Sequence, residues 1–221
     1  MLDIIGKSTE TSVIGNHEGL NGKIIFHDKS GTVKLPSVNG NLHIEVWKEG
    51  SVSGNIDISG LRRFGNIRIF SKNGGSVKIA PMTTIEQCYF LADGENITLG
   101  EDCMVSFGIS FRTTDAHGIY DIQSGDRINH NAAISIESHV WIGQGCTIAK
   151  GTTVEMSSVI GAFSFTSNGL YERNAVYAGT PARKIKDNIT WDRQQCENIF
   201  DEGASVDSYF QNNLDMLIGK T

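Results

Sequence analysis

The sequence is short of proline, of paired cysteines and of long apolar runs. Only 3 of its 221 residues are proline, whereas 25 are glycine, and this balance favours many short strands joined by tight turns. The four cysteines form no CxxC pair (Cys88, Cys103, Cys146 and Cys196). Their spacing therefore gives no zinc motif and no disulfide framework, and it predicts reduced thiols.

Positive charge is also in the minority, since 19 Lys and Arg residues face 25 Asp and Glu residues for a net charge of −6. Phosphate binding needs a basic face, so this balance argues against nucleic acid as the main partner. No apolar run approaches the length of a bilayer span, and the first residues lack the basic start and apolar middle of a signal peptide. We therefore expect a cytoplasmic protein with no transmembrane segment.

The chain does have a period of six residues. From Ile136 onward the first position of each hexad is aliphatic and the fifth is small or moderate in size. A helix would let this stripe wander around its axis, and a plain strand would alternate with a period of two. A coil of three hexads, about 18 residues long, places every first position inside a prism. The first positions are Ile136, Ile142, Ile148, Val154 and Ile160, and the fifth positions are Val140, Cys146, Thr152, Ser158 and Ser164.

The same spacing continues upstream in two columns, Ile79–Ile85–Leu91–Ile97–Cys103–Ile109 and Val46–Val52–Ile58–Phe64–Phe70. Ile109 and Ile136 lie 27 positions apart, which is not a multiple of six, so a loop must interrupt the coil between them. We predict an all-β fold, with a β-helix domain over residues 1–188 and a short helical extension over residues 189–221. Within the domain we expect irregular early coils over residues 1–45 and a protruding loop region over residues 110–133.

Four segments in order resemble a known family: "TTDAHGIYD", "GDRINH", "HVWIGQGCTIAKGTT" and "AGTPARKIKDNITW". They are similar to the hexapeptide-repeat acetyltransferases, and most of all to the bacterial polysialic acid O-acetyltransferases that decorate capsules. The resemblance covers residues 97 to 193. It implies a left-handed parallel β-helix, a homotrimer or a dimer of trimers, and acetyl-CoA in a groove between adjacent prisms. It also implies direct acetyl transfer to a carbohydrate hydroxyl, with sialic acid of a capsular polysaccharide as the acceptor and no metal.

The resemblance carries two residue roles. His117 aligns with the general base of the family, which makes residues 110–133 the expected active-site loop, and Trp141 aligns with a tryptophan of the active site. Around Thr166 to Asn168 the chain departs from the meningococcal-type members, which have a tyrosine there. This departure leaves the identity of the acceptor open.

The residues themselves suit this chemistry. A sugar hydroxyl needs a base to take its proton before it attacks a thioester, and the imidazole of His117 suits that task near neutral pH. Asp115, two positions earlier, either orients that ring or forms an Asx turn. The oxyanion that develops needs a donor, for which the backbone of the Trp141–Gly143 stretch is the candidate. His130 and His139 are expected to be structural.

Trp141 precedes an inward residue and should therefore face outward, where acetyl-CoA, sugar or a neighbouring subunit covers it. Small residues leave the backbone bare for a pantetheine arm, and basic residues after the "AGTPA" loop either hold phosphates or form solvated surface. The expected acetyl-CoA site is Trp141, Gly143, Gly161, Ala162, Ala178, Gly179, Arg183, Lys184 and Lys186. The candidates for holding an anionic acceptor are Arg112, Arg127 and Lys150.

Three alternatives stay open from the sequence. Carbonic anhydrases share this fold but need three histidines at a zinc, two of them close in sequence, and no such close pair exists among His117, His130 and His139. A non-catalytic β-helix could serve as a binding or ice-binding face, although no Thr-x-Thr row is present. Another sugar, such as a lipopolysaccharide unit, a nucleotide-linked sugar or a small xenobiotic sugar, could be the acceptor.

Overall fold

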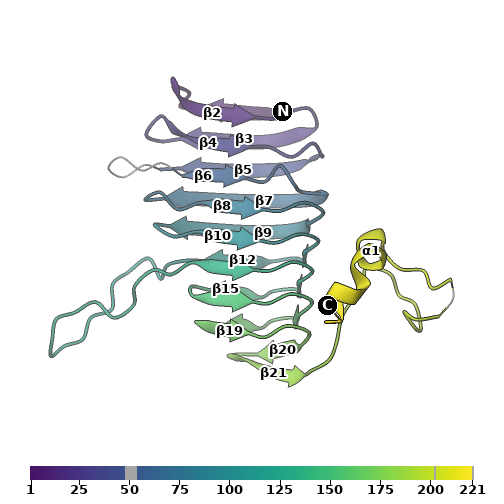
Figure 1. Cartoon of the computed structure of the whole chain (residues 1–221). Helices are drawn as coiled ribbons and strands as arrows, with labels where there is room; N and C mark the ends of the chain where they lie inside the picture. Colours follow the sequence, from purple (N-terminus) through teal and green to yellow (C-terminus); the bar gives the residue numbers. More distant parts are fainter. Residues whose placement is uncertain (48–53, 202, 221) are drawn as a thin grey trace.

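In the computed structural model the chain winds into a tall parallel β-helix (Figure 1). The structure describes residues 1–47, 54–201 and 203–220. Strands of successive coils pair in parallel along the whole prism, which confirms the expected all-β solenoid. An antiparallel pair, between β20 (Val176–Gly179) and β21 (Ala182–Lys186), closes its lower end in Figure 1.

The strands form two ladders. The first contains β1 (Leu2–Ile5), β3 (Leu20–Phe26), β5 (Gly40–Val46), β7 (Arg63–Lys72), β9 (Thr84–Asp93), β11 (Met104–Val105), β12 (Ile109–Arg112), β14 (Trp141–Ile142), β15 (Thr147–Ala149), β17 (Val159–Ile160), β18 (Phe165–Thr166), β20 (Val176–Gly179) and β21 (Ala182–Lys186). The second contains β2 (Glu10–Ile14), β4 (Ser30–Lys34), β6 (Asn55–Asp57), β8 (Val77–Ile79), β10 (Ile97–Leu99), β13 (Ile134–Ile136), β16 (Thr152–Val154) and β19 (Gly169–Tyr171).

The lower coils follow the hexad rule. Ile136 pairs with Val154 and Ile142 with Ile160, each 18 positions further along the chain. Each of these coils has three short strands, one for each side of the prism. Every predicted first and fifth position between Ile136 and Ser164 is buried, so the phase of these hexads is confirmed.

The upper coils are longer, and here two predictions are wrong. Leu20 pairs with Gly40 and Val77 with Ile97, each 20 positions apart, and Cys88 pairs with Ile109, 21 positions apart. The predicted column from Ile79 to Ile109 is therefore buried as expected, but its coils close two or three residues late. Residues 1–45 are not irregular, because β1 to β5 form continuous parallel ladders there. In the earlier column Phe70 points outward and is only half-buried, and Val52 lies outside the described residues.

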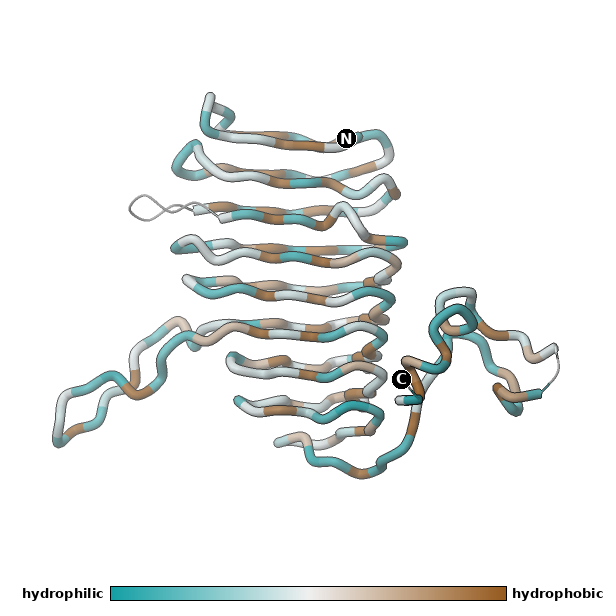
Figure 2. Tube along the Cα trace, in the orientation of Figure 1, coloured by the Kyte–Doolittle hydropathy of each residue, from teal (hydrophilic) through white to brown (hydrophobic). Residues whose placement is uncertain are grey.

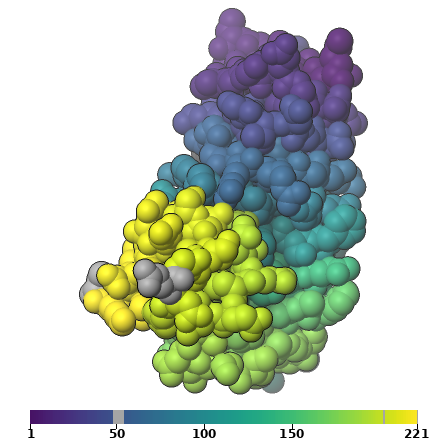
Figure 3. Space-filling model, turned by 90° about the vertical axis from the view of Figure 1, so that its right-hand side faces the viewer, coloured from purple at the N-terminus to yellow at the C-terminus, as the bar shows by residue number. Residues whose placement is uncertain are grey.

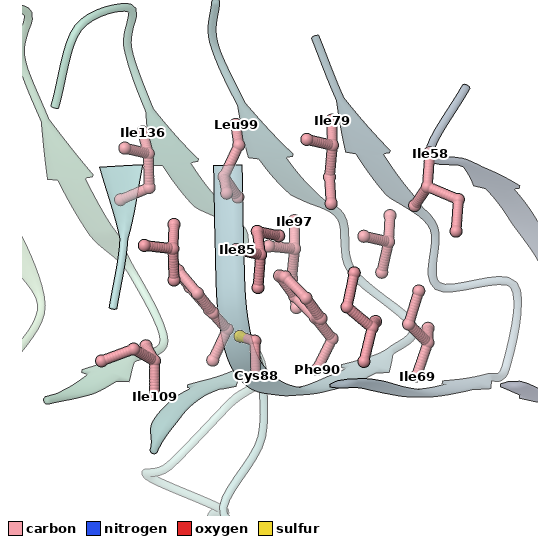
Figure 4. Close-up of a cluster of buried hydrophobic side chains, with 14 of the residues drawn as sticks. Ile58, Ile69, Ile79, Ile85, Cys88, Phe90, Ile97, Leu99, Ile109 and Ile136 are labelled. Carbon is pink, nitrogen blue, oxygen red and sulfur yellow. The ribbon is translucent and has the colours of Figure 1, made fainter. Parts of the chain in front are cut away.

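The core is a continuous stack of aliphatic and aromatic side chains. Ile79, Leu99 and Ile136 stand in register on β8, β10 and β13, and Figure 4 shows them in one row facing the side chains of the opposite ladder. Phe90 and Phe111 stack with ring centroids 4.9 Å apart. Figure 2 shows the alternation of apolar and polar residues along each coil. Burying one such side chain contributes about 1.5–3 kcal/mol before entropy is subtracted, so the prism depends on many coils together.

The predicted interruption is present as a loop of residues 113–133 between β12 and β13, and it projects from the side of the prism (Figure 1). Leu99 before the loop pairs directly with Ile136 after it, so the loop is an insertion that leaves the stack unbroken. An isolated bridge between Tyr120 and Arg127 ties its two arms together.

After β21 the chain lies on the outside of its own prism, where Figure 3 shows its C-terminal residues in yellow. It ends in helix α1 (Ser208–Leu217), which is labelled in Figure 1. Asp207 caps this helix by accepting a hydrogen bond from the backbone N–H of Tyr209 at 3.0 Å. Phe210 and Leu217 are buried on the inner side. The expected helical extension thus contains one helix within the described residues.

A buried polar cluster fastens this tail to the prism. The two ring nitrogens of His139 lie 2.8 Å from Asp102 Oδ2 and 2.7 Å from the carbonyl oxygen of Trp191. Trp191 stacks on the His139 ring at 4.2 Å, and Arg193 donates to Asp102 Oδ1 at 2.9 Å. We call Asp102, His139, Trp191 and Arg193 the tail latch.

Among the described residues there is no helix long and apolar enough to cross a bilayer. The same residues contain no group of three or more His, Cys, Asp or Glu side chains that could hold a metal ion.

Candidate active site

His117 stands on the protruding loop with its side chain exposed. Asn129, on the returning arm of the loop, donates its amide to the backbone carbonyl of His117 at 2.8 Å and accepts the N–H of Ile119 at 2.7 Å. Ala116 adopts a positive φ of 67° just before the histidine. No hydrogen bond to the His117 ring exists within the described part of the chain, so the backbone is held while the imidazole stays open to a ligand.

Asp115 lies beside His117 in sequence but serves a different partner. Its Oδ2 accepts hydrogen bonds from Lys150 Nζ at 2.5 Å and from Asn129 Nδ2 at 2.8 Å. The bonds from Lys150 and Asn129 hold the pKa of the Asp115 carboxyl below its usual value, so it is ionised at neutral pH. Asp115 therefore anchors the loop to the end of β15, and it forms neither of the two contacts considered for it, with the His117 ring or in an Asx turn.

The three basic residues expected to hold an acceptor separate into two groups. Arg127 donates to Asn129 Oδ1, to the carbonyl of Asn129 and to Asn131 Oδ1, at 3.2 to 3.3 Å. Lys150 is engaged by Asp115 and by the carbonyl of Asn129 at 3.0 Å. Arg127 and Lys150 therefore stabilise the fold of the loop. The side chain of Arg112, at the foot of the loop, makes no hydrogen bond among the residues that the structure describes.

Replacing Lys150 with methionine is expected to loosen the loop. The substitution keeps the aliphatic stem but removes the ion pair with Asp115, which is about half-exposed and therefore contributes at most about 1 kcal/mol. Proteolytic cleavage within residues 113–133 should become faster by up to about fivefold. Because the pKa of Asp115 is lowered by folding, the bond stabilises the loop at neutral pH and is lost as the pH falls through that pKa.

The matched control is Lys184→Met, which removes an exposed ion pair with Asp187 at the lower end of the prism and should leave loop cleavage unchanged. Equal cleavage of the loop in wild type and Lys150→Met would show that Lys150 does not anchor it.

Trp141 lies on β14 and faces outward with 38% of its surface exposed, as the sequence predicted. It borders a groove of about 620 Å³ that Arg62, Glu86, Met104 and Arg193 also line. Gly143 and Gly161 follow in register on neighbouring coils. A Cβ at Gly143 would lie only 2.7 Å from the backbone N of Ala162, so the close approach of the coils excludes a side chain here.

The backbone of the Trp141–Gly143 stretch is not free to bind an oxyanion. The N–H of Trp141 donates to the Ser158 carbonyl at 3.0 Å, and the N–H of Gly143 donates to the Ile160 carbonyl at 2.8 Å. The ladder between coils therefore uses both donors, because parallel strands bond on both sides. The expectation that they serve as oxyanion donors is wrong for these two groups.

The "AGTPA" loop joins β20 to β21. Ala178 packs 3.1 Å from the place where a Cβ of Gly161 would be, and the N–H of Gly179 donates to Ser164 Oγ at 3.0 Å. Hydrogen bonds from Lys184 to Glu172 and Asp187 hold the pKa of Lys184 above its usual value. Of the three basic residues, Arg183 and Lys186 are exposed without an ion-pair partner in the described chain.

His117 and Trp141 do not meet within one chain. The loop that carries His117 projects from one side of the prism, whereas the C-terminal tail lies on the other side (Figure 1). Trp141 belongs to the side with the tail, since its ring lies 6.2 Å from that of Trp191. The candidate base and the candidate donor groove are therefore separate surfaces of the same molecule.

Sequence reasoning missed two parts of this arrangement. Asn129, which is 9% exposed, carries only one signal in the sequence, a side-chain amide that can both donate and accept between the arms of a loop. The latch residue Arg193, which lines the groove beside Trp141, gave no signal, because its contacts with Asp102 join residues 91 positions apart.

Comparisons with known proteins agree with this fold. No protein-family model matches the chain. It is 34% identical over 121 residues to a polysialic acid O-acetyltransferase of Neisseria meningitidis, covering 55% of the chain and 56% of that relative. It is 32% identical over 142 residues to a polysialic acid O-acetyltransferase of Escherichia coli O1:K1, covering 64% and 46%. The chain thus spans about half the length of the curated relatives it matches.

Among solved structures, the crystal structure of the polySia-specific acetyltransferase NeuO superposes with a TM-score of 0.63 at 28% identity, over 98% of each chain. The likeness therefore extends beyond the segments with recognisable motifs to the upper coils and the tail. In sequence and in fold, the chain is similar to the polysialic acid O-acetyltransferases, and its stack of 18-residue coils fits the resemblance to the hexapeptide-repeat acetyltransferases.

Proposed function

We propose that the protein is an O-acetyltransferase that moves an acetyl group from acetyl-CoA directly to a carbohydrate hydroxyl, with sialic acid residues of polysialic acid as the acceptor. The observation that carries this proposal is His117. Its backbone is clamped by Asn129 while its ring is exposed and unbonded within the described chain. This is the arrangement that a general base for an incoming hydroxyl requires.

The donor side is supported by the groove at Trp141. Gly143, Gly161 and Ala178 stand in register on three successive coils, so no large side chain covers the backbone beside the exposed indole. A thin pantetheine arm fits such a strip, and Arg183 and Lys186 beyond it suit the phosphates. The residues present therefore fit acetyl-CoA, whose thioester supplies an activated acetyl group when it is bound.

In this mechanism His117 accepts the proton of the sugar hydroxyl as the oxygen attacks the thioester carbon, and then returns a proton to the departing sulfur. The charge on the carbonyl oxygen needs backbone donors. The amides of Gln144 and Ala162 are the candidates, since neither donates a hydrogen bond in the described ladder. Asp115 and Asn129 keep the loop in place without touching the ring of His117.

The separation of His117 from Trp141 supports a homotrimer, alone or paired into a hexamer. In a closed ring of copies, the loop of one prism can reach the Trp141 groove of the next, so that each interface contains one complete site. The four free cysteines, three of them buried, support a reducing compartment such as the cytoplasm.

The test is CoA release from acetyl-CoA, followed with a thiol reagent, with and without polysialic acid. We expect release that depends on the polymer. The protein's own buried thiols should react slowly, because burial raises the pKa of Cys88 and Cys146 and raises that of Cys103 to about 12. Cys196, which is half-buried, gives the background to subtract.

Dextran, an uncharged polysaccharide, is the control acceptor and should give no release. If protein that binds acetyl-CoA releases no CoA with polysialic acid, the proposed acceptor is wrong. If it also releases none with lipopolysaccharide or nucleotide-linked sugars, the proposed transferase activity is wrong.

A further inference from the structure

One outer face of the upper coils carries five rings in contact with one another. His43, Phe70 and Tyr89 lie on β5, β7 and β9, and His27 and Trp47 directly follow β3 and β5; these four strands lie one below the other in Figure 1. Ring centroids are 4.2 Å apart for His27 and Trp47, 5.7 Å for Trp47 and Phe70, and 5.5 Å for Phe70 and Tyr89. We call these five residues the ring ladder. The fold needs none of them in its core, because they face outward.

Basic groups lie directly on the ring ladder. The Arg68 guanidinium lies 5.6 Å from the centroid of the Phe70 ring, and Lys72 Nζ lies 5.0 Å from that of Trp47. Neither makes an ion pair with any residue that the structure describes. The one acid among the rings, Glu45, already accepts hydrogen bonds from His27 at 2.8 Å and His43 at 2.6 Å. In a chain with a net charge of −6, this face offers uncompensated cations beside aromatic surface.

The ring ladder is continuous with the foot of the active-site loop. Glu45 pairs in register with Phe70, Phe70 with Leu91, and Leu91 with Arg112, where β12 ends and the loop begins. Beside this column a hollow of about 300 Å³ is lined by Asn66, Arg68, Gln87, Tyr89 and Ser110. With strands about 4.8 Å apart, the face runs roughly 20 Å from β3 to β12, which is long enough for several linked sugar rings.

We propose that this face binds an acidic polysaccharide at sugar units remote from the one that is acetylated. The C–H face of a sugar ring packs on an aromatic ring by dispersion and by attraction to the negative face of the π-system. Arg68, Lys72 and Arg112 supply cations for carboxylates, and the amides of Asn66 and Gln87 supply hydrogen bonds for hydroxyls. Polysialic acid as the specific polymer rests on the proposed function, whereas the charge and the aromatic surface select the ligand class.

The experiment compares long polysialic acid with a short sialic acid oligomer as acceptors. Trp47→Ala and Lys72→Ala are each expected to raise KM for the long polymer about tenfold, with kcat and both parameters for the short oligomer unchanged. The reason is that only the long chain reaches from the active-site loop to the ring ladder. The matched control is Lys78→Ala on β8, an exposed lysine of the opposite ladder, which should leave every parameter at the wild-type value.

Binding of fluorescently labelled polysialic acid without acetyl-CoA separates this inference from the proposed function. If wild type shows no polymer-dependent CoA release but binds the labelled polymer, and the two variants bind it about tenfold more weakly, the binding face stands and the acetyl-transfer proposal fails. If the variants match wild type in both KM and binding, the binding face is wrong. A change in sedimentation coefficient on substituting Trp47, with unchanged polymer binding, would assign the face to a second copy of the chain and also overturn the proposal.

Discussion

Replacing His117 with alanine is expected to lower kcat for acetyl transfer about 10²- to 10⁴-fold, the usual contribution of a general base. The methyl group cannot take the proton of the attacking hydroxyl. The loop itself should stay in place, because Asn129 holds the backbone carbonyl of His117 and not its ring. KM for acetyl-CoA should therefore change little, and the loss should appear in kcat measured by CoA release.

The matched control is His130→Ala. His130 lies in the same loop, is equally exposed and should be replaceable with no loss of rate. Full activity in His117→Ala would show that His117 is not the general base. A large loss in both variants would indicate that the loop, and not one base, was damaged.

Mixing two inactive variants tests whether the site lies between copies. His117→Ala and Trp141→Ala chains that are unfolded together and refolded as a mixture should regain activity, because some interfaces then combine an intact His117 with an intact Trp141 of the next copy. For random assembly of equal amounts the recovery is about one quarter of the wild-type rate, since each interface draws its two residues from two independent chains. No recovery would place the complete site within one chain.

The success of the hexads has a physical basis. Between Ile136 and Ser164 a coil closes after 18 residues, so one inward position in six repeats without drift and can be followed in the sequence. Between Leu20 and Ile109 paired positions of successive coils lie 20 to 25 residues apart, two to seven more than 18, and ten-residue strands such as β7 and β9 extend over two sides. Inward residues there follow the alternation of a strand, so a search for period six finds some of them and misses how the coil closes.

The site could be predicted only where it is local in sequence. The position of His117 followed from the break in the repeat, and the outward orientation of Trp141 followed from its inward neighbour. The partner of Asp115 could not be predicted, because Lys150 is 35 positions away and approaches only when the loop folds back. The sequence also could not predict that the backbone N–H groups of Trp141 and Gly143 are already hydrogen-bonded, since these bonds depend on the register of the next coil.

Replacing Asp102 with alanine is expected to lower the free energy of unfolding by about 3–5 kcal/mol, because it leaves the Arg193 guanidinium in this buried cluster without its carboxylate partner. The Asp102 side chain is 2% exposed and lies between the His139 ring, at 2.8 Å, and the Arg193 guanidinium, at 2.9 Å. Without the carboxylate, the Arg193 guanidinium and the Nδ1 atom of His139 lose their partner in the tail latch, and the tail should detach before the prism melts. Urea denaturation at fixed protein concentration measures the change.

Asp102→Asn separates charge from backbone conformation. Asp102 has a positive φ of 51°, which asparagine adopts at a lower cost than alanine, so the asparagine variant retains the turn and loses only the charge. Asp102→Asn should therefore lower the free energy of unfolding less than Asp102→Ala does. The control Glu86→Ala removes an exposed ion pair with Arg63 and should lower the free energy of unfolding by less than about 1 kcal/mol. If Asp102→Ala costs no more than Glu86→Ala, the latch contributes nothing to stability. The tail would then be held by the burial of Phe210 and Leu217 and by the hydrogen bonds that Arg62, Arg173 and Asn174 donate to it.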